Sequence, residues 1–262
     1  MRQEAYFCTV KELDELGKNN IPRQLISHTH LIYSSPATLA FNSPGAEGFG
    51  VKRAGLAVPD SVMLIVSPGC CGRNTSVLSS MRAYQDRFYY LLMDETDIVT
   101  GRHLKKIPKA VAEICEGLKK KPSVVMICIT CVDALLGTDM ERVCHKAEEY
   151  AGVPVRPCYM YALTREGRKP PMVHVRQSVY SLLEPKKKKG NVVNLLGYFS
   201  PLTDDCELYD LLHGAGVKTI HEISRCRDYA QYQTMSEANF NLVLHPEARF
   251  AAEDFHDRLK IP

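Results

Sequence analysis

The 262-residue sequence has no tryptophan, no apolar run that approaches the length of a membrane span, and no clear excess of either charge. Its 33 basic and 30 acidic residues nearly cancel, so the composition favours neither a nucleic acid nor a membrane as a partner. The first five residues lack the apolar stretch of a secretory signal, and we expect a cytoplasmic protein with reduced thiols. The glycine loop that cradles phosphates in ATPases is also missing, which argues against ATP hydrolysis by this chain.

From residue 62 onward, short apolar strands alternate with amphipathic helices, which is the pattern of a parallel α/β sheet. We predict strands at residues 62–66, 87–93, 123–129, 191–196, 217–220 and 239–244. Helices are predicted at residues 75–83, 104–119, 140–151, 173–183, 203–213 and 248–259. The stretch that follows Pro154 and Pro157 is interpreted as a loop that runs to Pro171, and Val143, Ala147 and Tyr150 are expected on the buried face of their helix.

The sequence predicts two consecutive α/β domains. The first covers residues 1–185 and the second residues 191–262, and they are joined at residues 186–190 by a basic segment that we interpret as a solvated linker. Residues 260–262 are typical of a helix end that turns into another strand. We therefore expect a further C-terminal α/β domain that this chain lacks.

Ten cysteines are more than packing requires, and three of them follow predicted strands directly. Cys70 and Cys71 lie on the glycine-flanked turn Ser-Pro-Gly-Cys-Cys-Gly after strand 62–66, and Cys131 follows strand 123–129. Open α/β folds bind ligands outside the carboxyl ends of their strands, and a rigid turn suits a thiolate that ligates iron. These cysteines are candidates for a metal cluster or for redox chemistry, and a tight turn with buried thiols is the alternative.

Cys128 and Cys131 also fit the C-x-x-C spacing of a dithiol oxidoreductase or of half a zinc site. Cys128 lies within the strand and would face away from Cys131, so we assign it to the core, and Cys144 to helix packing. We assign His28, His30 and the lone histidines, among them His103, His145 and His174, to the surface or to packing. The remaining cysteines that a zinc site would need are dispersed: Cys158, Cys206 and Cys226.

Three motifs in this order resemble the component 1 family of nitrogenase-like oxidoreductases. They are the turn at residues 67–72, the segment at residues 94–101 with Leu104, and Thr130-Cys131 followed by Leu-Leu-Gly-Thr-Asp-Met-Glu-Arg-Val at residues 135–143. The resemblance covers residues 40–262. It implies Rossmann-like parallel-sheet domains of the nitrogenase component 1 type, in a protein that is nitrogenase-like and not a true dinitrogenase.

The resemblance also implies metal ligands. In that family, cysteines from three loops of each subunit bind an iron–sulfur cluster at the subunit interface. Cys71 and Cys131 match the second and third loops, whereas the first-loop stretch, residues 42–48, has glycines and no thiol. Two cysteines from each subunit of a homodimer would provide four thiolates, the complement of one [4Fe–4S] cluster. Cys70 is an alternative third ligand, and a heterodimer with a paralogue is an alternative assembly.

The family's dinitrogenase binds its iron–molybdenum cofactor through a cysteine after the strand that resembles residues 241–244. The corresponding loop begins with His245, so we expect no such cofactor, and His245 becomes a candidate pocket residue, with loop packing as its alternative. The resemblance implies an oxidoreductase subunit that receives electrons from an ATP-hydrolysing iron protein and reduces an organic substrate such as a tetrapyrrole. A non-catalytic scaffold or carrier for metallocofactor assembly is the alternative, and a structural zinc protein ranks last.

Overall fold

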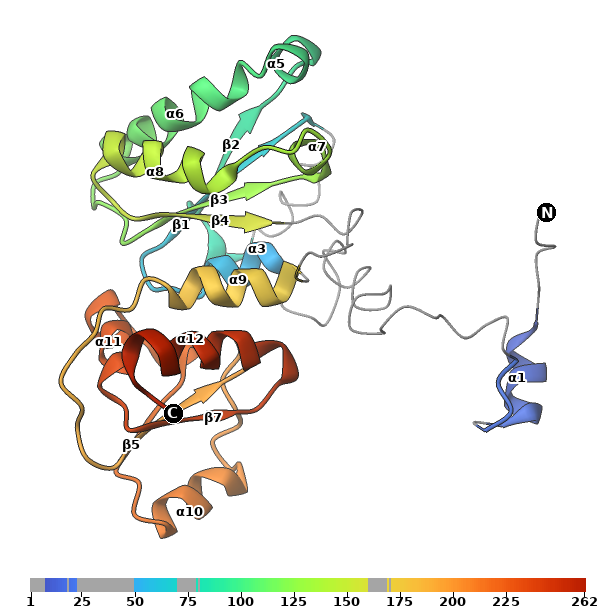
Figure 1. Cartoon of the computed structure of the whole chain (residues 1–262), viewed down its shortest axis with the longest axis vertical. Helices are drawn as coiled ribbons and strands as arrows, with labels where there is room; N and C mark the ends of the chain where they lie inside the picture. The colour runs from blue at the N-terminus through green and yellow to red at the C-terminus, as the bar shows by residue number, and fades with distance from the viewer. Residues whose placement is uncertain are drawn as a thin grey trace.

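A computed structural model describes residues 8–17, 19–22, 50–69, 79, 81–159, 169 and 171–262 of the chain. Its strands form two parallel sheets, a four-stranded one with the order β2-β1-β3-β4 and a three-stranded one with the order β6-β5-β7 (Figure 1). We refer to them as sheet A and sheet B. Among the described helices, none combines the length and the apolar character that crossing a bilayer requires.

Sheet A is built from apolar runs. Its strands are β1 (Val62–Ser67), β2 (Phe88–Leu92), β3 (Val125–Ile129) and β4 (Val155–Tyr159). Every residue of the two central strands, β1 and β3, is buried, as expected where helices cover both faces of a parallel sheet. Val66 of β1 lies opposite Ile129 of β3 at the end of their ladder, so these two strands end side by side.

Helices cover the two faces of sheet A. One face packs against α6 (His103–Gly117) and α8 (Met140–Ala151), and the other against α3 (Val51–Gly55) and α9 (Pro171–Tyr180). Shorter helices follow two of the strands: α5 (Glu95–Thr100) after β2 and α7 (Cys131–Leu135) after β3. A further helix, α1 (Val10–Leu16), buries none of its residues.

Sheet B follows the same design on a smaller scale. Its strands are β5 (Val192–Leu196), β6 (Thr219–His221) and β7 (Phe240–Val243). Its helices are α10 (Glu207–Gly214), α11 (Tyr229–Gln233) and α12 (Arg249–Leu259), and its 3₁₀ turns are Ile223–Arg225, Thr234–Glu237 and Pro246–Ala248. Side chains of α10 pack on one face with Val193 and Leu195, and α12 covers the other.

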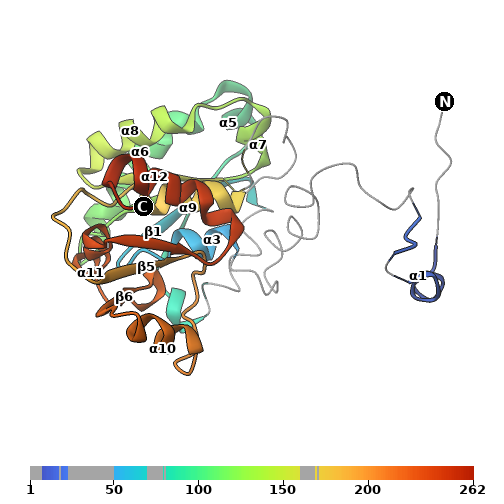
Figure 2. The same ribbon diagram turned by 60° about the horizontal axis from the view of Figure 1, so that its bottom comes forward.

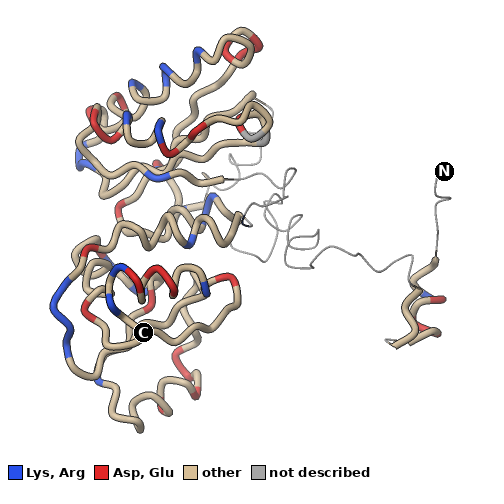
Figure 3. The backbone as a smooth tube through the Cα atoms, viewed as in Figure 1, with Lys and Arg blue, Asp and Glu red and all other residues tan. Residues whose placement is uncertain are grey.

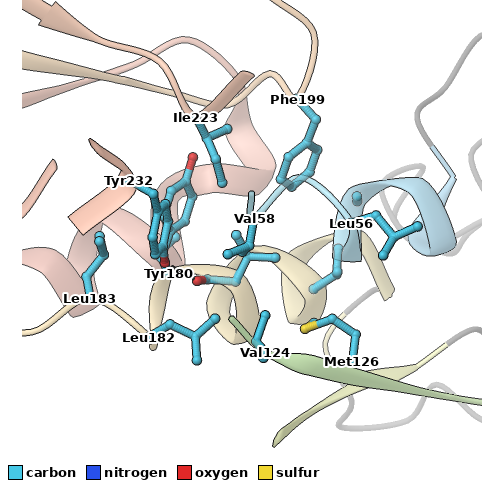
Figure 4. Packing of buried hydrophobic residues seen from close by; sticks show 14 of the residues in the cluster. Leu56, Val58, Val124, Met126, Tyr180, Leu182, Leu183, Phe199, Ile223 and Tyr232 are labelled. Carbon is cyan, nitrogen blue, oxygen red and sulfur yellow. Dashed lines mark hydrogen bonds between the residues drawn. The ribbon is translucent and has the colours of Figure 1, made fainter. Parts of the chain in front are cut away.

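Helix α9 joins the two sheets. It packs against α3 and β4 of sheet A and against α12 of sheet B, and both views show α9 and α12 side by side (Figures 1 and 2). One hydrophobic cluster therefore runs from Met126 of β3 through Tyr180 of α9 to Phe199 and Tyr232 on the side of sheet B (Figure 4). The rings of Tyr180 and Phe255, from α9 and α12, meet edge to face with 5.2 Å between centroids. The interior of the molecule is continuous across both sheets.

The predicted parallel α/β class and the six predicted strands are confirmed. The interpretation of the stretch after Pro157 as a loop is wrong at its start, because β4 occupies Val155–Tyr159 and was not predicted. Pro157 cannot donate a ladder hydrogen bond, but β4 is the edge strand of sheet A, where proline is tolerated. Tyr150 is 67% exposed, so its expected burial is also wrong. The predicted helix at residues 75–83 lies mostly outside the described residues, and its described end is part of a 3₁₀ turn at Arg82–Tyr84.

The basic segment at residues 186–189 runs along the outside of the molecule from α9 to β5 (Figure 3). Two of its lysines bind the 3₁₀ turn Thr234–Glu237 beside sheet B. Lys188 Nζ donates to the Ser236 carbonyl at 2.7 Å, and Lys189 Nζ lies 2.6 Å from a carboxylate oxygen of Glu237. At the other side of sheet B, the Asn241 N–H donates to the Pro262 carbonyl at 2.6 Å, so residues 261–262 lie beside β7.

Candidate functional site at the carboxyl edges of the sheets

The segments that carry the candidate cysteines leave sheet A from its two central strands. Ser67 is the last residue of β1, and the chain continues from it toward Cys70 and Cys71, which lie outside the described residues. Cys131 is the first residue of α7, directly after β3 and Thr130. Because β1 and β3 are paired neighbours, both segments start at the same place on the carboxyl edge. That Cys70, Cys71 and Cys131 act as ligands stays a prediction.

A buried polar pair anchors α7 below this edge. Asp133, fully buried, places Oδ1 2.9 Å from Nε2 of His103 and accepts a hydrogen bond from Thr138 Oγ1 at 3.1 Å. The other ring nitrogen of His103, Nδ1, lies 3.0 Å from the Asp97 carbonyl, which can only accept, so Nδ1 donates. This pair ties the helix that begins with Cys131 to the start of α6.

Residues 94–101 form α5 and the turn after it, and they bind the start of α6. Asp94 caps α5 by accepting the N–H of Asp97 at 2.6 Å, and the chain then turns at Gly101 in the left-handed region, with φ 66°. The buried Asp97 carboxylate accepts from Lys106 Nζ at 2.7 Å and from Arg102 Nε at 2.6 Å. These two cations, Lys106 first, hold the pKa of Asp97 well below its usual value. The contacts of Asp97 with Arg102 and Lys106 fix the start of α6, and hence the position of His103.

Buried polar atoms without a hydrogen-bond partner gather at the same edge. Five such side-chain atoms occur in the described parts of the chain: Ser67 Oγ, Thr130 Oγ1, Asp133 Oδ2, Asn194 Oδ1 and Ser224 Oγ. Ser67 and Thr130 lie where β1 and β3 end, and Asp133 lies in α7, the helix that follows β3. Because buried polar groups are nearly always paired, this concentration marks the edge as a place where another group belongs.

Cys128 belongs to a different arrangement. It lies opposite Cys158 in the β3–β4 ladder, and both side chains are completely buried. The Cys158 thiol donates to the Val51 carbonyl at 3.3 Å, and burial raises its pKa. The assignment of Cys128 to the core is confirmed, and Cys144 is buried in α8 as expected. Sequence analysis missed the pairing with Cys158 because it did not predict β4.

His245 lies at the carboxyl edge of sheet B, in the loop after β7. Its Nδ1 accepts the N–H of Glu247 at 3.3 Å, and its ring meets that of Tyr198 with 5.9 Å between centroids. Burial is the main reason that its pKa is lowered. The close approach of His245 requires glycine at position 197, because a Cβ there would lie 2.7 Å from the backbone nitrogen of His245. The φ of Gly197, 144°, is also one that other residues rarely adopt. His245 thus packs against its neighbours in the loop while its side chain is 37% exposed, and its role as a pocket residue stays a prediction.

Arg176 of α9 binds this loop and the loop after β5. Two of its guanidinium nitrogens donate to the Gly197 carbonyl, at 3.2 and 2.6 Å, and Nη1 lies 2.9 Å from a carboxylate oxygen of Glu247. The guanidinium carbon is 4.9 Å from the ring centre of Phe199. Arg176 therefore links the loop after β5, at Gly197, to the loop after β7 that carries His245. No sequence pattern signalled this residue, since its partners lie 21 and 71 positions away.

The carboxyl ends of both sheets open toward the same side of the molecule, as the strand arrows show in Figure 1. A separate cavity of about 410 Å³ lies beside edge strand β4, between α8 and α9, and includes His145, Arg156 and His174 in its wall. Within the described ranges, no group of three or more His, Cys, Asp or Glu side chains is arranged to hold a metal ion.

Comparison with known proteins agrees with this architecture. Residues 47–262 match the family described as nitrogenase component 1 type oxidoreductase. The nitrogenase iron-molybdenum cofactor biosynthesis protein NifE of Rhizobium meliloti (strain 1021) is 28% identical over 176 residues, 64% of this chain and 37% of that protein. The same protein of Klebsiella pneumoniae is 26% identical over 222 residues, 77% of this chain and 48% of that protein. The chain thus spans less than half the length of these relatives.

Among solved structures, one described as Nitrogenase Cp1 at pH 5 has the same fold. It aligns with a TM-score of 0.57 at 21% sequence identity. The alignment covers 79% of this chain and 45% of that chain.

Proposed function

Because the chain belongs to the nitrogenase component 1 type oxidoreductases, we propose that it is a subunit of a nitrogenase-like reductase. It receives electrons from an ATP-dependent iron protein and passes them to an organic substrate such as a tetrapyrrole. Cys71 and Cys131 hold an iron–sulfur cluster of the [4Fe–4S] type at the interface with a second subunit, either a copy of this chain or a paralogue. The cluster supplies one-electron chemistry, and we place the protein in the cytoplasm, where thiols stay reduced.

The observation that carries this proposal is the side-by-side ending of β1 and β3. The two segments with candidate ligands leave the sheet from adjacent central strands, at the edge where open α/β folds bind their ligands. The residues around this edge suit such a cluster. Thiolates are the usual ligands of iron–sulfur clusters, and Ser67 and Thr130 are buried there with no hydrogen-bond partner for their hydroxyls among the residues that the structure describes.

Single replacements of Cys71 and Cys131 by serine test the ligand set. Each should remove the iron, the acid-labile sulfide and the visible charge-transfer absorption of protein prepared without oxygen. Cys206→Ser is the matched control, since Cys206 lies at the start of α10 and away from sheet A, and it should leave all three unchanged. Cys70→Ser decides whether a third thiol takes part. Full cluster content in both the Cys71 and Cys131 variants would contradict the proposal.

Assembly of a metallocofactor is a second candidate function. It is favoured by the curated relatives, which are named as cofactor biosynthesis proteins. The two functions differ in what happens to the electrons and to the cluster. Turnover of substrate with an iron protein and a reductant supports the reductase, and His245→Gln should then lower turnover without changing iron content. Absence of turnover, together with transfer of metal to an acceptor protein, supports the scaffold.

A further inference from the structure

Two buried hydroxyl groups, those of Ser67 and Thr130, lie at the carboxyl edge of sheet A. Ser67 is 0% exposed and Thr130 is 1% exposed, and neither Ser67 Oγ nor Thr130 Oγ1 has a hydrogen-bond partner within the described parts of the chain. The two residues are neighbours, because they come directly after the Val66–Ile129 pair in the β1–β3 register. Each also precedes a segment with candidate ligands in the sequence, since Thr130 is followed by Cys131 and Ser67 comes three residues before Cys70.

An unpartnered buried hydroxyl lowers stability, because it loses its hydrogen bonds to water and gains none in return. At these positions an apolar side chain of the same size would avoid that cost. Two such groups side by side at a ligand-binding edge are therefore explained best by a hydrogen-bond acceptor that binds there. The nearby Asp133 Oδ2 is an acceptor itself and needs a donor, so it belongs to a different explanation.

We propose that the hydroxyls of Ser67 and Thr130 donate hydrogen bonds to sulfur atoms of the iron–sulfur cluster, and that they raise its reduction potential. This inference rests on the function proposed above. The sulfur atoms of the cluster and of its thiolates carry negative charge and act only as acceptors, whereas a hydroxyl is free to donate. Such bonds favour the reduced cluster, which carries the additional negative charge, and hydrogen bonding to sulfur is a known determinant of cluster potential.

The test compares variants that remove or keep the hydroxyl. Thr130→Val keeps the shape and removes the hydroxyl, Thr130→Ser keeps the hydroxyl, and Ser67→Ala removes the second donor. Ser224→Ala is the matched control, because Ser224 Oγ is also buried and unpartnered but lies in the 3₁₀ turn Ile223–Arg225, beside sheet B. The reduction potential of the cluster is measured by anaerobic redox titration followed by electron paramagnetic resonance, with iron content determined on the same samples.

We expect Thr130→Val and Ser67→Ala to retain iron and to shift the potential to more negative values, while Thr130→Ser and Ser224→Ala leave it unchanged. Thermal unfolding gives a second readout. Without the cluster, Thr130→Val should melt at a higher temperature than the wild type, and with the cluster this gain should shrink or reverse. Loss of the cluster from Thr130→Val but not from Thr130→Ser also supports the proposal, because the variant that retains the hydroxyl then retains the cluster.

An unchanged potential in both Thr130→Val and Ser67→Ala, with full iron content, overturns this inference and leaves the proposed function intact. An equal shift in Thr130→Ser overturns it as well, because the lost methyl group would then be the cause. Lower stability of cluster-free Thr130→Val would show that the hydroxyl already has a partner, and would contradict the proposal. A wild-type protein that binds no cluster under any condition overturns both the inference and the proposed function.

Discussion

Replacement of Arg176 by methionine should lower the free energy of unfolding by about 3–5 kcal/mol, the usual cost of removing one partner from a buried ion pair. Arg176 is only 4% exposed, and its guanidinium donates to the carbonyls of Gly197 and Met172 and to the carboxylate of Glu247. Methionine keeps the apolar stem of the side chain, so packing changes little. In the variant, the Glu247 carboxylate, which is only 12% exposed, and the carbonyls of Gly197 and Met172 lose this donor.

Lys120→Met is the matched control. Lys120 Nζ lies 2.7 Å from a carboxylate oxygen of Asp60, but its side chain is 75% exposed. Exposed pairs contribute about 0–1 kcal/mol, so this control should change stability by less than 1 kcal/mol. A double-mutant cycle that combines Arg176→Met with Glu247→Gln isolates the ion pair, for which we expect a coupling energy of about 1–3 kcal/mol.

Urea unfolding followed by far-ultraviolet circular dichroism measures all four proteins of this cycle and the control. Equal denaturant slopes are needed for the comparison, since a change in slope indicates a change in the unfolded or folded state. If Arg176→Met lies within about 1 kcal/mol of Lys120→Met, then the buried network around the His245 loop does not stabilise the fold, and the reasoning fails.

Three further predictions follow from other parts of the molecule. Gly197→Ala should lower the free energy of unfolding in urea by about 1–3 kcal/mol or more, because of the positive φ of Gly197 and its close contact with His245. Gly216→Ala is the control: its φ is 89° but the space around it is open, so the loss of stability should be smaller, and equal losses would rule out the steric argument. The pKa of Asp97 is lowered, so the stability contributed by its carboxylate is complete above about pH 4 and is lost as the pH falls below that value. Asp97→Asn should therefore flatten the acid limb of the unfolding free energy, and an unchanged limb would refute this. Calorimetry of the isolated chain with magnesium-ATP should show no binding, since no phosphate-cradling loop is present, and micromolar affinity would contradict it.

The fold was predictable where one physical signal dominates. Strands β1 and β3 are continuous apolar runs because both faces of the sheet are covered, and α8 has its expected bounds because an apolar stripe and a following glycine define it. Strand β4 was not predictable in the same way. Pro157 and Arg156 interrupt its apolar pattern, and only its position at the edge of the sheet makes them acceptable.

The candidate site was predictable in position but not in its supporting contacts. The carboxyl edge of sheet A follows from the order of strand and turn, which local sequence reveals. The pair of His103 and Asp133 does not, because the two residues are 30 positions apart and meet only after α6 and β3 have packed. Arg176 likewise gave no signal, since a buried arginine in an apolar helix is explained only by its distant partners.

The position of α9 between the two sheets also bears on how this protein is made. Synthesis delivers β1 to β4 and then α9, whereas α12, which covers the other side of α9, follows only after sheet B. During that interval the side chains of α9 that later pack against α12, such as Tyr180, lack their packing partners. A nascent chain in this condition is prone to association, and it is the kind of species that chaperones bind. Native α9 is therefore completed by residues that are translated long after it.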